Sequence, residues 1–291
     1  MPSSELSIAA AARAAPPADG ITVWLLGNAG VLVADASGRR IAIDPWTSPW
    51  LETRGAANPE PVVRQRPARL LSEELAGLVD AVLVTHEHPD HLDPGLAEVL
   101  TGAGVPVFLP EGCLPAARAC GYPDAALHPV RVGEDVDVVG FGIAALPAAH
   151  AFAGDGYGGY TEWVDERGSH RAVGFVVRGG GRVLFHSGDT VMWHGLAERL
   201  RAAGVDTCLL PINGRDWLRE ERGLVGNLTA RESADLAAAC GADVLIPVHF
   251  DGAVGNTGSP GELVDYASVA YPQLSVLLPG RSGVHLPPLV R

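Results

Sequence analysis

The chain contains no lysine, so all 21 of its basic residues are arginines. Without lysine the protein cannot form a Schiff base with a carbonyl compound, and it cannot use the lysine of a phosphate-binding P-loop. The formal net charge is −13. A protein that binds nucleic acid needs a basic surface that releases counterions from the phosphates, and the sequence shows none. We therefore expect no nucleic-acid partner.

Long apolar runs are also missing. No stretch reaches the roughly 18 apolar residues that cross a bilayer, so we expect no membrane partner. Residues 1–19 are rich in alanine and proline, but Glu5 and Arg13 do not fit a secretory signal peptide. We interpret residues 1–19 as a loose N-terminal extension and residues 20–291 as one domain.

The cysteines form no C-x-x-C pair, and no motif of a catalytic thiol surrounds any of them. They are Cys113, Cys120, Cys208 and Cys240. This pattern predicts reduced, mostly buried thiols in a cytoplasmic protein, and it argues against a cysteine nucleophile.

Short β-branched segments alternate with helical patterns along the chain. The predicted strands are 21–26, 31–34, 41–43, 81–84, 107–109, 136–139, 143–146, 172–177, 183–185, 207–210, 244–247 and 274–278, and the predicted helices are 94–101, 114–119, 192–203, 230–240 and 260–270. Thr229 and Glu232 form a capping box for the fourth helix. Two halves of mixed sheet with helices outside predict an α/β (α+β) fold, a four-layer αββα sandwich. The glycine-rich run 154–159 predicts a loop that could cover a site.

The strongest motif is Thr85-His86-Glu87-His88-Pro89-Asp90-His91, directly after a buried strand. Three imidazoles and a carboxylate within six residues offer nitrogen and oxygen ligands to a divalent metal. A metal centre needs ligands from several elements, and later strand ends supply them: His150, Asp189 and His249. Each alone could cap a loop, but together they predict a metal site.

This arrangement of His-x-His-x-Asp-His, a lone histidine, Gly188-Asp189-Thr190 and a final histidine resembles the metallo-β-lactamase superfamily. It is most similar to the L-ascorbate-6-phosphate lactonase-like branch, with support from five further segments: Leu26–Gly30, Ile43–Trp46, Pro211–Asp216, Gly226-Asn227 and Asn256–Gly258. The resemblance runs from about Ile21 to about Gly280 and implies the αββα sandwich.

The resemblance implies that His86, His88 and His150 hold one metal, that Asp90, His91 and His249 hold a second, and that Asp189 bridges them. All seven offer nitrogen or oxygen, so Zn²⁺, Mn²⁺ and Fe²⁺ remain candidates. The absence of a cysteine ligand argues against the antibiotic-hydrolysing branch, and His88 in place of glutamate argues against the flavodiiron oxidoreductases.

Several further polar residues are candidates around the metals. Asp44 is expected to support the metal loop from behind, and His186 to support it or to contact substrate. His194, which opens a predicted helix, is expected to face the cleft. A cluster after the strand 207–210 is expected to bind substrate: Asn213, Arg215, Asp216 and Asn227.

Arg215 is the candidate to clamp an anionic substrate group, because a guanidinium can donate two parallel hydrogen bonds. The alternative is that Arg215 pairs with a carboxylate and only shapes its loop. Arg219 and Arg222 fall in a charged run that we interpret as a solvated surface.

The residues therefore predict a dinuclear hydrolase in which a metal-bridging hydroxide attacks a small polar substrate, with Asp90 and Asp189 as catalytic residues. The resemblance favours an anionic lactone. One alternative is a phosphodiesterase resembling the N-acyl-phosphatidylethanolamine-hydrolysing phospholipase D, and another is a non-catalytic metal-binding interaction protein. The sequence leaves a homo-oligomer open.

Overall fold

Two seven-stranded sheets lie face to face in the computed structural model, which describes residues 7–14, 16–53, 62–153 and 159–289. The first sheet has the strand order β16 (Val284–Leu286), β1 (Ile21–Gly27), β2 (Gly30–Asp35), β3 (Arg40–Ile43), β4 (Ala81–Leu83), β5 (Val107–Pro110) and β6 (Leu127–Val130). The second has the order β15 (Ser275–Val276), β14 (Val244–Val248), β13 (Thr207–Pro211), β12 (Arg182–His186), β11 (Val173–Gly179), β8 (Phe141–Pro147) and β7 (Asp135–Val138). A separate hairpin pairs β9 (Ala149–Phe152) with β10 (Tyr160–Glu162).

Alternation along β1 shows how the layers form. Val23 and Leu25 point into the apolar core between the sheets, whereas Trp24 and Leu26 point into a second core under the outer helices. Successive side chains of a strand face opposite sides, so one strand with apolar residues throughout contributes to both cores.

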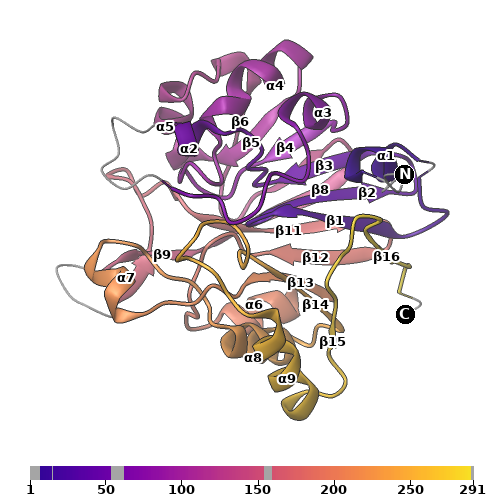
Figure 1. Cartoon of the computed structure of the whole chain (residues 1–291), viewed down its shortest axis with the longest axis vertical. Helices are drawn as coiled ribbons and strands as arrows, with labels where there is room; N and C mark the ends of the chain where they lie inside the picture. Colours follow the sequence, from indigo (N-terminus) through magenta and orange to yellow (C-terminus); the bar gives the residue numbers. More distant parts are fainter. Residues whose placement is uncertain (1–6, 15, 54–61, 154–158, 290–291) are drawn as a thin grey trace, which may run out of the picture.

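Helices cover both outer faces of the sheet pair (Figure 1). The first sheet packs against α1 (Ile8–Arg13), α3 (Ser72–Ala76), α4 (Ala97–Ala103) and α5 (Leu114–Ala119). The second packs against α6 (Leu196–Ala202), α8 (Ala230–Cys240) and α9 (Pro260–Ala270). Two short helices, α2 (Trp50–Thr53) and α7 (Trp217–Glu221), complete the α-helices of the described residues. The predicted αββα sandwich is confirmed.

The capping box predicted for α8 is also present. The Thr229 hydroxyl accepts a hydrogen bond from the Glu232 backbone N–H, and the Glu232 carboxylate accepts one from the Thr229 backbone N–H. The helix ends at Gly241, whose φ of 84° suits glycine and stops the helix. Local chemistry therefore fixes both ends of α8 where the sequence predicted them.

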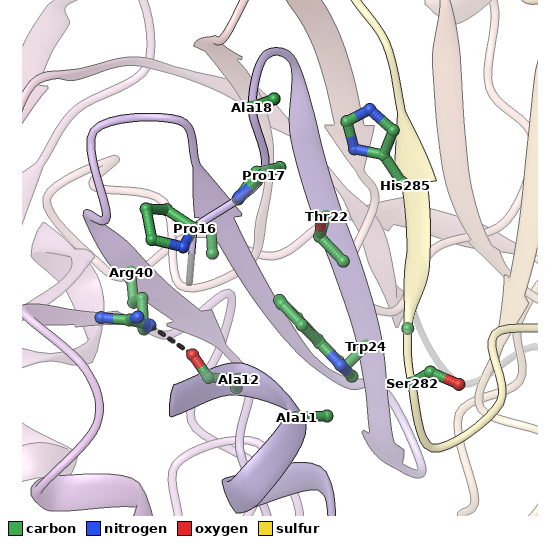
Figure 2. Close-up of a pocket in the computed structure, with 12 residues that line it drawn as sticks. Ala11, Ala12, Pro16, Pro17, Ala18, Thr22, Trp24, Arg40, Ser282 and His285 are labelled. Carbon is green, nitrogen blue, oxygen red and sulfur yellow. Dashed lines mark hydrogen bonds between the residues drawn. The ribbon is translucent and has the colours of Figure 1, made fainter. Parts of the chain in front are cut away.

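The expectation of a loose extension is wrong for the residues that form α1. The Ser7 hydroxyl caps this helix, and Ile8, Ala9 and Ala12 are buried against the first sheet. Arg40 of β3 donates a hydrogen bond to the Ala12 carbonyl at 3.0 Å (Figure 2). The apolar residues of this segment therefore form one packed face of the helix.

The structure adds strands that the sequence pattern did not reveal. β6 and β16 have few apolar residues, and these are interrupted by histidine and, in β6, by proline. His150 lies within a further strand, β9, whereas the sequence placed it after a strand. Residues 154–158 of the predicted glycine-rich loop lie outside the described residues. Among the helices that are described, none is long and apolar enough to cross a membrane.

Candidate metal centre

Four strand-end segments bring the predicted ligands together. The loop 85–91 follows β4, Asp189 follows β12, and His249 follows β14, while His150 lies in β9. β12, β13 and β14 are parallel neighbours, so their carboxyl ends meet at one edge of the second sheet. The two sheets are joined at this edge, where the Val173 backbone N–H donates to the Thr85 carbonyl at 3.0 Å.

The ligand atoms form three overlapping groups, each with all donor atoms within 4.8 Å of one another. The groups are His86–His88–His150, His86–His91–Asp189 and Asp90–His91–His249. Nδ1 of His88 lies 3.0 Å from Nε2 of His86 and 3.2 Å from Nε2 of His150. A tetrahedral ion with bonds of about 2.0–2.1 Å separates its ligand nitrogens by about 3.3 Å, so this spacing suits a small divalent ion.

Asp189 lies between the two sets of histidines. Its Oδ1 is 3.3 Å from Nε2 of His91, and its Oδ2 is 3.6 Å from Nε2 of His150 and 3.5 Å from Nε2 of His249. The Asp189 carboxylate therefore faces His150 of the first group and both His91 and His249 of the third group. This is the position that a bridging ligand requires.

The first group consists of neutral imidazoles. Burial lowers the pKa of His86 and of His88, and it lowers the pKa of His150 to about 3. A metal ligates imidazole only in the deprotonated form, so these three rings are ready to bind without losing a proton.

The remaining ligands carry charge. Burial alone would lower the pKa of His91 and His249, but Asp189 and the neighbouring carboxylates raise both values. Burial alone would raise the pKa of Asp90 and Asp189, but His91 and His249 hold both values below the usual range. Protons on His91 and His249 thus offset the buried carboxylates, and a divalent ion would replace them.

Unsatisfied buried atoms show that the residues present fit metal ions. Nε2 of His91, Nε2 of His249 and Oδ1 of Asp189 are buried and have no hydrogen-bond partner among the described residues. Leaving buried polar atoms without partners costs about 1–3 kcal/mol each, and a coordinated ion would satisfy them.

Asp44 holds the loop from behind, as predicted. Its Oδ2 accepts hydrogen bonds from Nδ1 of His91 at 2.8 Å and from the Thr85 hydroxyl at 2.6 Å, while its Oδ1 accepts from the Thr85 backbone N–H at 2.7 Å. The bond fixes the proton of His91 on Nδ1 and turns Nε2 towards Asp189.

His186 is fully buried and supports the Asp189 turn. Its Nε2 lies 2.8 Å from the Ala29 carbonyl, and its Nδ1 accepts a hydrogen bond from the Gly188 backbone N–H at 3.2 Å. The ring therefore contacts backbone groups on both sides, which favours the supporting role over contact with substrate.

Asn28 is a supporting residue that our reading of the sequence did not single out. Its side-chain Nδ2 donates a hydrogen bond to Oδ2 of Asp90 at 3.1 Å, and its backbone carbonyl accepts one from the His249 backbone N–H at 2.7 Å. Asp251 accepts the Asn28 backbone N–H at 3.0 Å and is paired with Arg69 at 2.7 Å. The backbone of Asn28 has a φ of 51°, a conformation that asparagine tolerates.

Trp163 was also missed. Its ring centroid lies 5.0 Å from that of His88, and the Arg171 guanidinium lies over the indole at 4.8 Å. Arg171 forms an ion pair with Glu87, the residue between His86 and His88. The Glu87 side chain is therefore directed towards Arg171 and away from the candidate metals. No motif around Trp163 marks this contact, because it depends on pairing between Arg171 and Trp163 across a hairpin.

The predicted anion clamp is wrong for Arg215. Both terminal nitrogens of Arg215 donate to the Glu232 carboxylate at 2.7 Å, and one also donates to the Asn227 carbonyl at 3.0 Å. The guanidinium is thus already neutralised, and it connects the loop to the start of α8. The alternative, an internal pair, holds, although the partner is Glu232 and not Asp216.

The other substrate candidates divide into a buried cluster and an exposed pair. Asn227 donates to the Asn213 side chain at 3.1 Å, and Asn213 donates to Asn256 at 2.8 Å. Arg219 completes this cluster through Asn256 and the Asn213 carbonyl, so its interpretation as a solvated residue is wrong. Asp216 caps α7 and pairs with Arg219, and His194 is exposed just before α6.

Comparison with known proteins places the chain among metal-dependent enzymes of related fold. The family model described as "Beta-lactamase superfamily domain" matches residues 39–250. The "probable L-ascorbate-6-phosphate lactonase UlaG" of Escherichia fergusonii is 25% identical, over 79% of this chain and 69% of that protein.

Solved structures share the fold. Igni18, described as a novel metallo hydrolase from Ignicoccus hospitalis, is 19% identical with a TM-score of 0.64, covering 91% of this chain and 97% of that one. A "possible metal-dependent hydrolase" from Veillonella parvula is 16% identical with a TM-score of 0.69, covering 92% and 99%.

Proposed function

The chain belongs to the metallo-β-lactamase superfamily, and we propose that it is a hydrolase that uses two divalent metal ions, Zn²⁺ or Mn²⁺ with Fe²⁺ as a further candidate, to open a small polar lactone. The ligand types support these ions, because every candidate donor is an imidazole nitrogen or a carboxylate oxygen. The similarity to a protein named as a lactonase supports the choice of an ester C–O bond.

The observation that carries the proposal is the placement of Asp189 between two histidine groups. A single ion would need one group of three ligands, whereas here two such groups share a buried carboxylate. Shared carboxylates of this kind hold paired ions a few ångströms apart. A role in protein interaction alone gives no reason to bury so many unsatisfied donor atoms together.

When bound, the two ions would supply Lewis acidity and lower the pKa of a coordinated water. The chain then positions the remaining groups. The Asp90 side chain is 26% exposed, whereas His91, Asp189 and His249 are buried, so substrate would approach from the Asp90 side. Asn28 holds one carboxylate oxygen of Asp90, which leaves the other to orient the attacking water and to accept its proton.

The substrate's charge is a separate part of the proposal. The family resemblance favours an anionic substrate, but Arg171, Arg215 and Arg219 are each paired with a carboxylate. We propose that hydrogen bonds from the Asn213–Asn227 cluster, rather than an arginine clamp, contribute to substrate recognition.

The test is an activity screen of the metal-loaded protein on lactones, phosphodiesters and amides, with Asp90→Asn as the matched variant. We expect lactone opening that chelation abolishes and that Asp90→Asn reduces by about 10²–10⁴-fold when the variant is assayed at metal concentrations that saturate both of its sites. Turnover of phosphodiesters without lactone opening would assign the phosphodiesterase alternative. The absence of any turnover by the fully loaded protein would favour a binding protein.

A further inference from the structure

A cavity of about 410 Å³ lies on the outer face of the first sheet, beside α1. Figure 2 shows Trp24 of β1 between Ala11 and Ala12 of α1 on one side and Pro16 and Pro17 on the other. None of the candidate metal ligands lines it. Its volume falls within the range of about 300–1,000 Å³ that is typical of small-molecule sites.

The Trp24 side chain brings an unsatisfied hydrogen-bond donor to this cavity. Trp24 is 4% exposed, and its Nε1 has no hydrogen-bond partner among the described residues. An indole N–H can only donate, and burying it without an acceptor is unfavourable. The wall of the cavity therefore contains a buried donor that lacks an acceptor.

The backbone of Gly283 packs directly against this N–H. A Cβ at Gly283 would lie 2.7 Å from Nε1 of Trp24 and 2.8 Å from Cε2, closer than non-bonded atoms can pack. Gly283 also has a φ of 75°, which disfavours other residues. Glycine at this position therefore allows the backbone to approach the indole ring closely.

Arg40 adds a positive charge to the wall. Its guanidinium donates to the carbonyls of Ala12 at 3.0 Å and Gly38 at 2.9 Å, and both acceptors are neutral. Asp80 accepts the Arg40 backbone N–H and forms no ion pair with the guanidinium. Nε2 of His285, another residue of the lining, lies 3.1 Å from Oδ1 of Asp19.

The rest of the lining is largely apolar. It consists of the Trp24 ring and six small apolar residues: Ala11, Ala12, Pro16, Pro17, Ala18 and Ala34. Such walls accommodate a hydrocarbon or aryl group, whereas the indole N–H and Arg40 favour an acceptor that carries negative charge.

We propose that this cavity is a second ligand site, which binds one small organic acid per chain. The apolar body of the acid lies on the alanine and proline wall, an acceptor atom meets the Trp24 N–H, and the carboxylate lies near Arg40. The proposal does not depend on the metal centre or on the reaction assigned to it.

Phenylacetate, with phenylacetamide as its neutral analogue, provides the probe. The metal-loaded protein is titrated while the indole ¹H–¹⁵N signals are followed by NMR, and Trp24→Phe identifies the Trp24 signal. We expect phenylacetate to shift that signal saturably, with an affinity roughly tenfold higher than that of the amide. Arg40→Gln should bring the two affinities together.

A pair of variants on α1 localises the binding. Ala11→Leu places a larger side chain in the cavity and should abolish the Trp24 shift. Ala10→Leu adds the same group to an exposed position on the same helix and should leave the titration unchanged.

Three results would overturn the proposal. They are an unmoved Trp24 signal, an equal response in Ala11→Leu, and equal affinities of the wild-type protein for acid and amide. Shifts elsewhere with Trp24 unmoved would show that phenylacetate binds only at the metals.

Discussion

Replacing Asp44 by asparagine should selectively weaken the second metal site. The two carboxylate oxygens of Asp44 accept three hydrogen bonds, from the Thr85 backbone N–H, the Thr85 hydroxyl and Nδ1 of His91. Asparagine has one oxygen and one NH₂ group. The NH₂ group must therefore replace one of the two carboxylate oxygens and face the donors that this oxygen accepted. The backbone of Asp44 has a φ of 48°, which asparagine tolerates, so the backbone itself need not change.

Both orientations of the new amide are unfavourable. If the NH₂ group faces His91, the ring must move its proton to Nε2 to accept the bond, and Nε2 can then no longer bind a metal. If the NH₂ group faces the Thr85 N–H, two buried donors meet without an acceptor, which costs about 1–3 kcal/mol. Loss of such a supporting group typically lowers metal affinity by about 10–100-fold, or about 1.4–2.7 kcal/mol.

Competition with a chromophoric chelator measures this effect. The second dissociation constant of Asp44→Asn should rise by about 10–100-fold, and the first should change much less. Asp206→Asn is the matched control, because buried Asp206 also accepts hydrogen bonds from a backbone N–H and a threonine hydroxyl and forms an ion pair with an arginine. It should lower stability without changing either constant. Unchanged metal affinity in Asp44→Asn, or an equal loss in Asp206→Asn, would refute the reasoning.

Three further predictions concern protons, Arg215 and the thiols. Because the pKa values of His91 and His249 are raised, their protons stabilise the ion-free protein below about pH 6.5, and this contribution is lost as the pH rises through the folded-state values. The second ion must displace these protons, so calorimetry in buffers of different ionisation enthalpy should show proton release and an affinity that rises with pH above about 6.5. Equal pH dependence for both ions would contradict this. Arg215→Ala should lower the free energy of unfolding by about 1 kcal/mol in urea melts and slow anionic and neutral substrates equally, since Arg215 pairs with Glu232. Slower turnover of the anionic substrate alone would instead support a role for Arg215 as the anion clamp. Cys113→Ser, Cys120→Ser, Cys208→Ser and Cys240→Ser should each retain lactone opening, and a variant that loses activity with its ions bound would reveal a catalytic thiol.

The positions of most candidate metal ligands at strand ends could be predicted because local sequence marks them. A buried strand precedes His86, a Gly-Asp-Thr turn carries Asp189, and β14 ends directly before His249. Strand ends fix side chains in space through backbone pairing, so periodicity and composition suffice to locate them. Asp44 could be placed for the same reason.

Residues whose role depends on pairing across distant segments could not be predicted. Asn28 reaches Asp90 and Asp251 through bonds that join three parts of the chain, and Trp163, which contacts His88, pairs with Arg171 across a hairpin. Arg215 was assigned to substrate because its loop resembles a binding loop, yet the Glu232 carboxylate in the first turn of α8 accepts hydrogen bonds from both of its terminal nitrogens. Such choices between partners are made by tertiary geometry.

Metal analysis of the wild-type protein and Asp189→Asn tests the central claim most directly. The claim predicts about two divalent ions per wild-type chain and weaker binding of both in Asp189→Asn, because one carboxylate lies between the two histidine groups. Asp206→Asn should keep both ions. A single ion per wild-type chain, bound equally well by Asp189→Asn, would contradict the dinuclear centre.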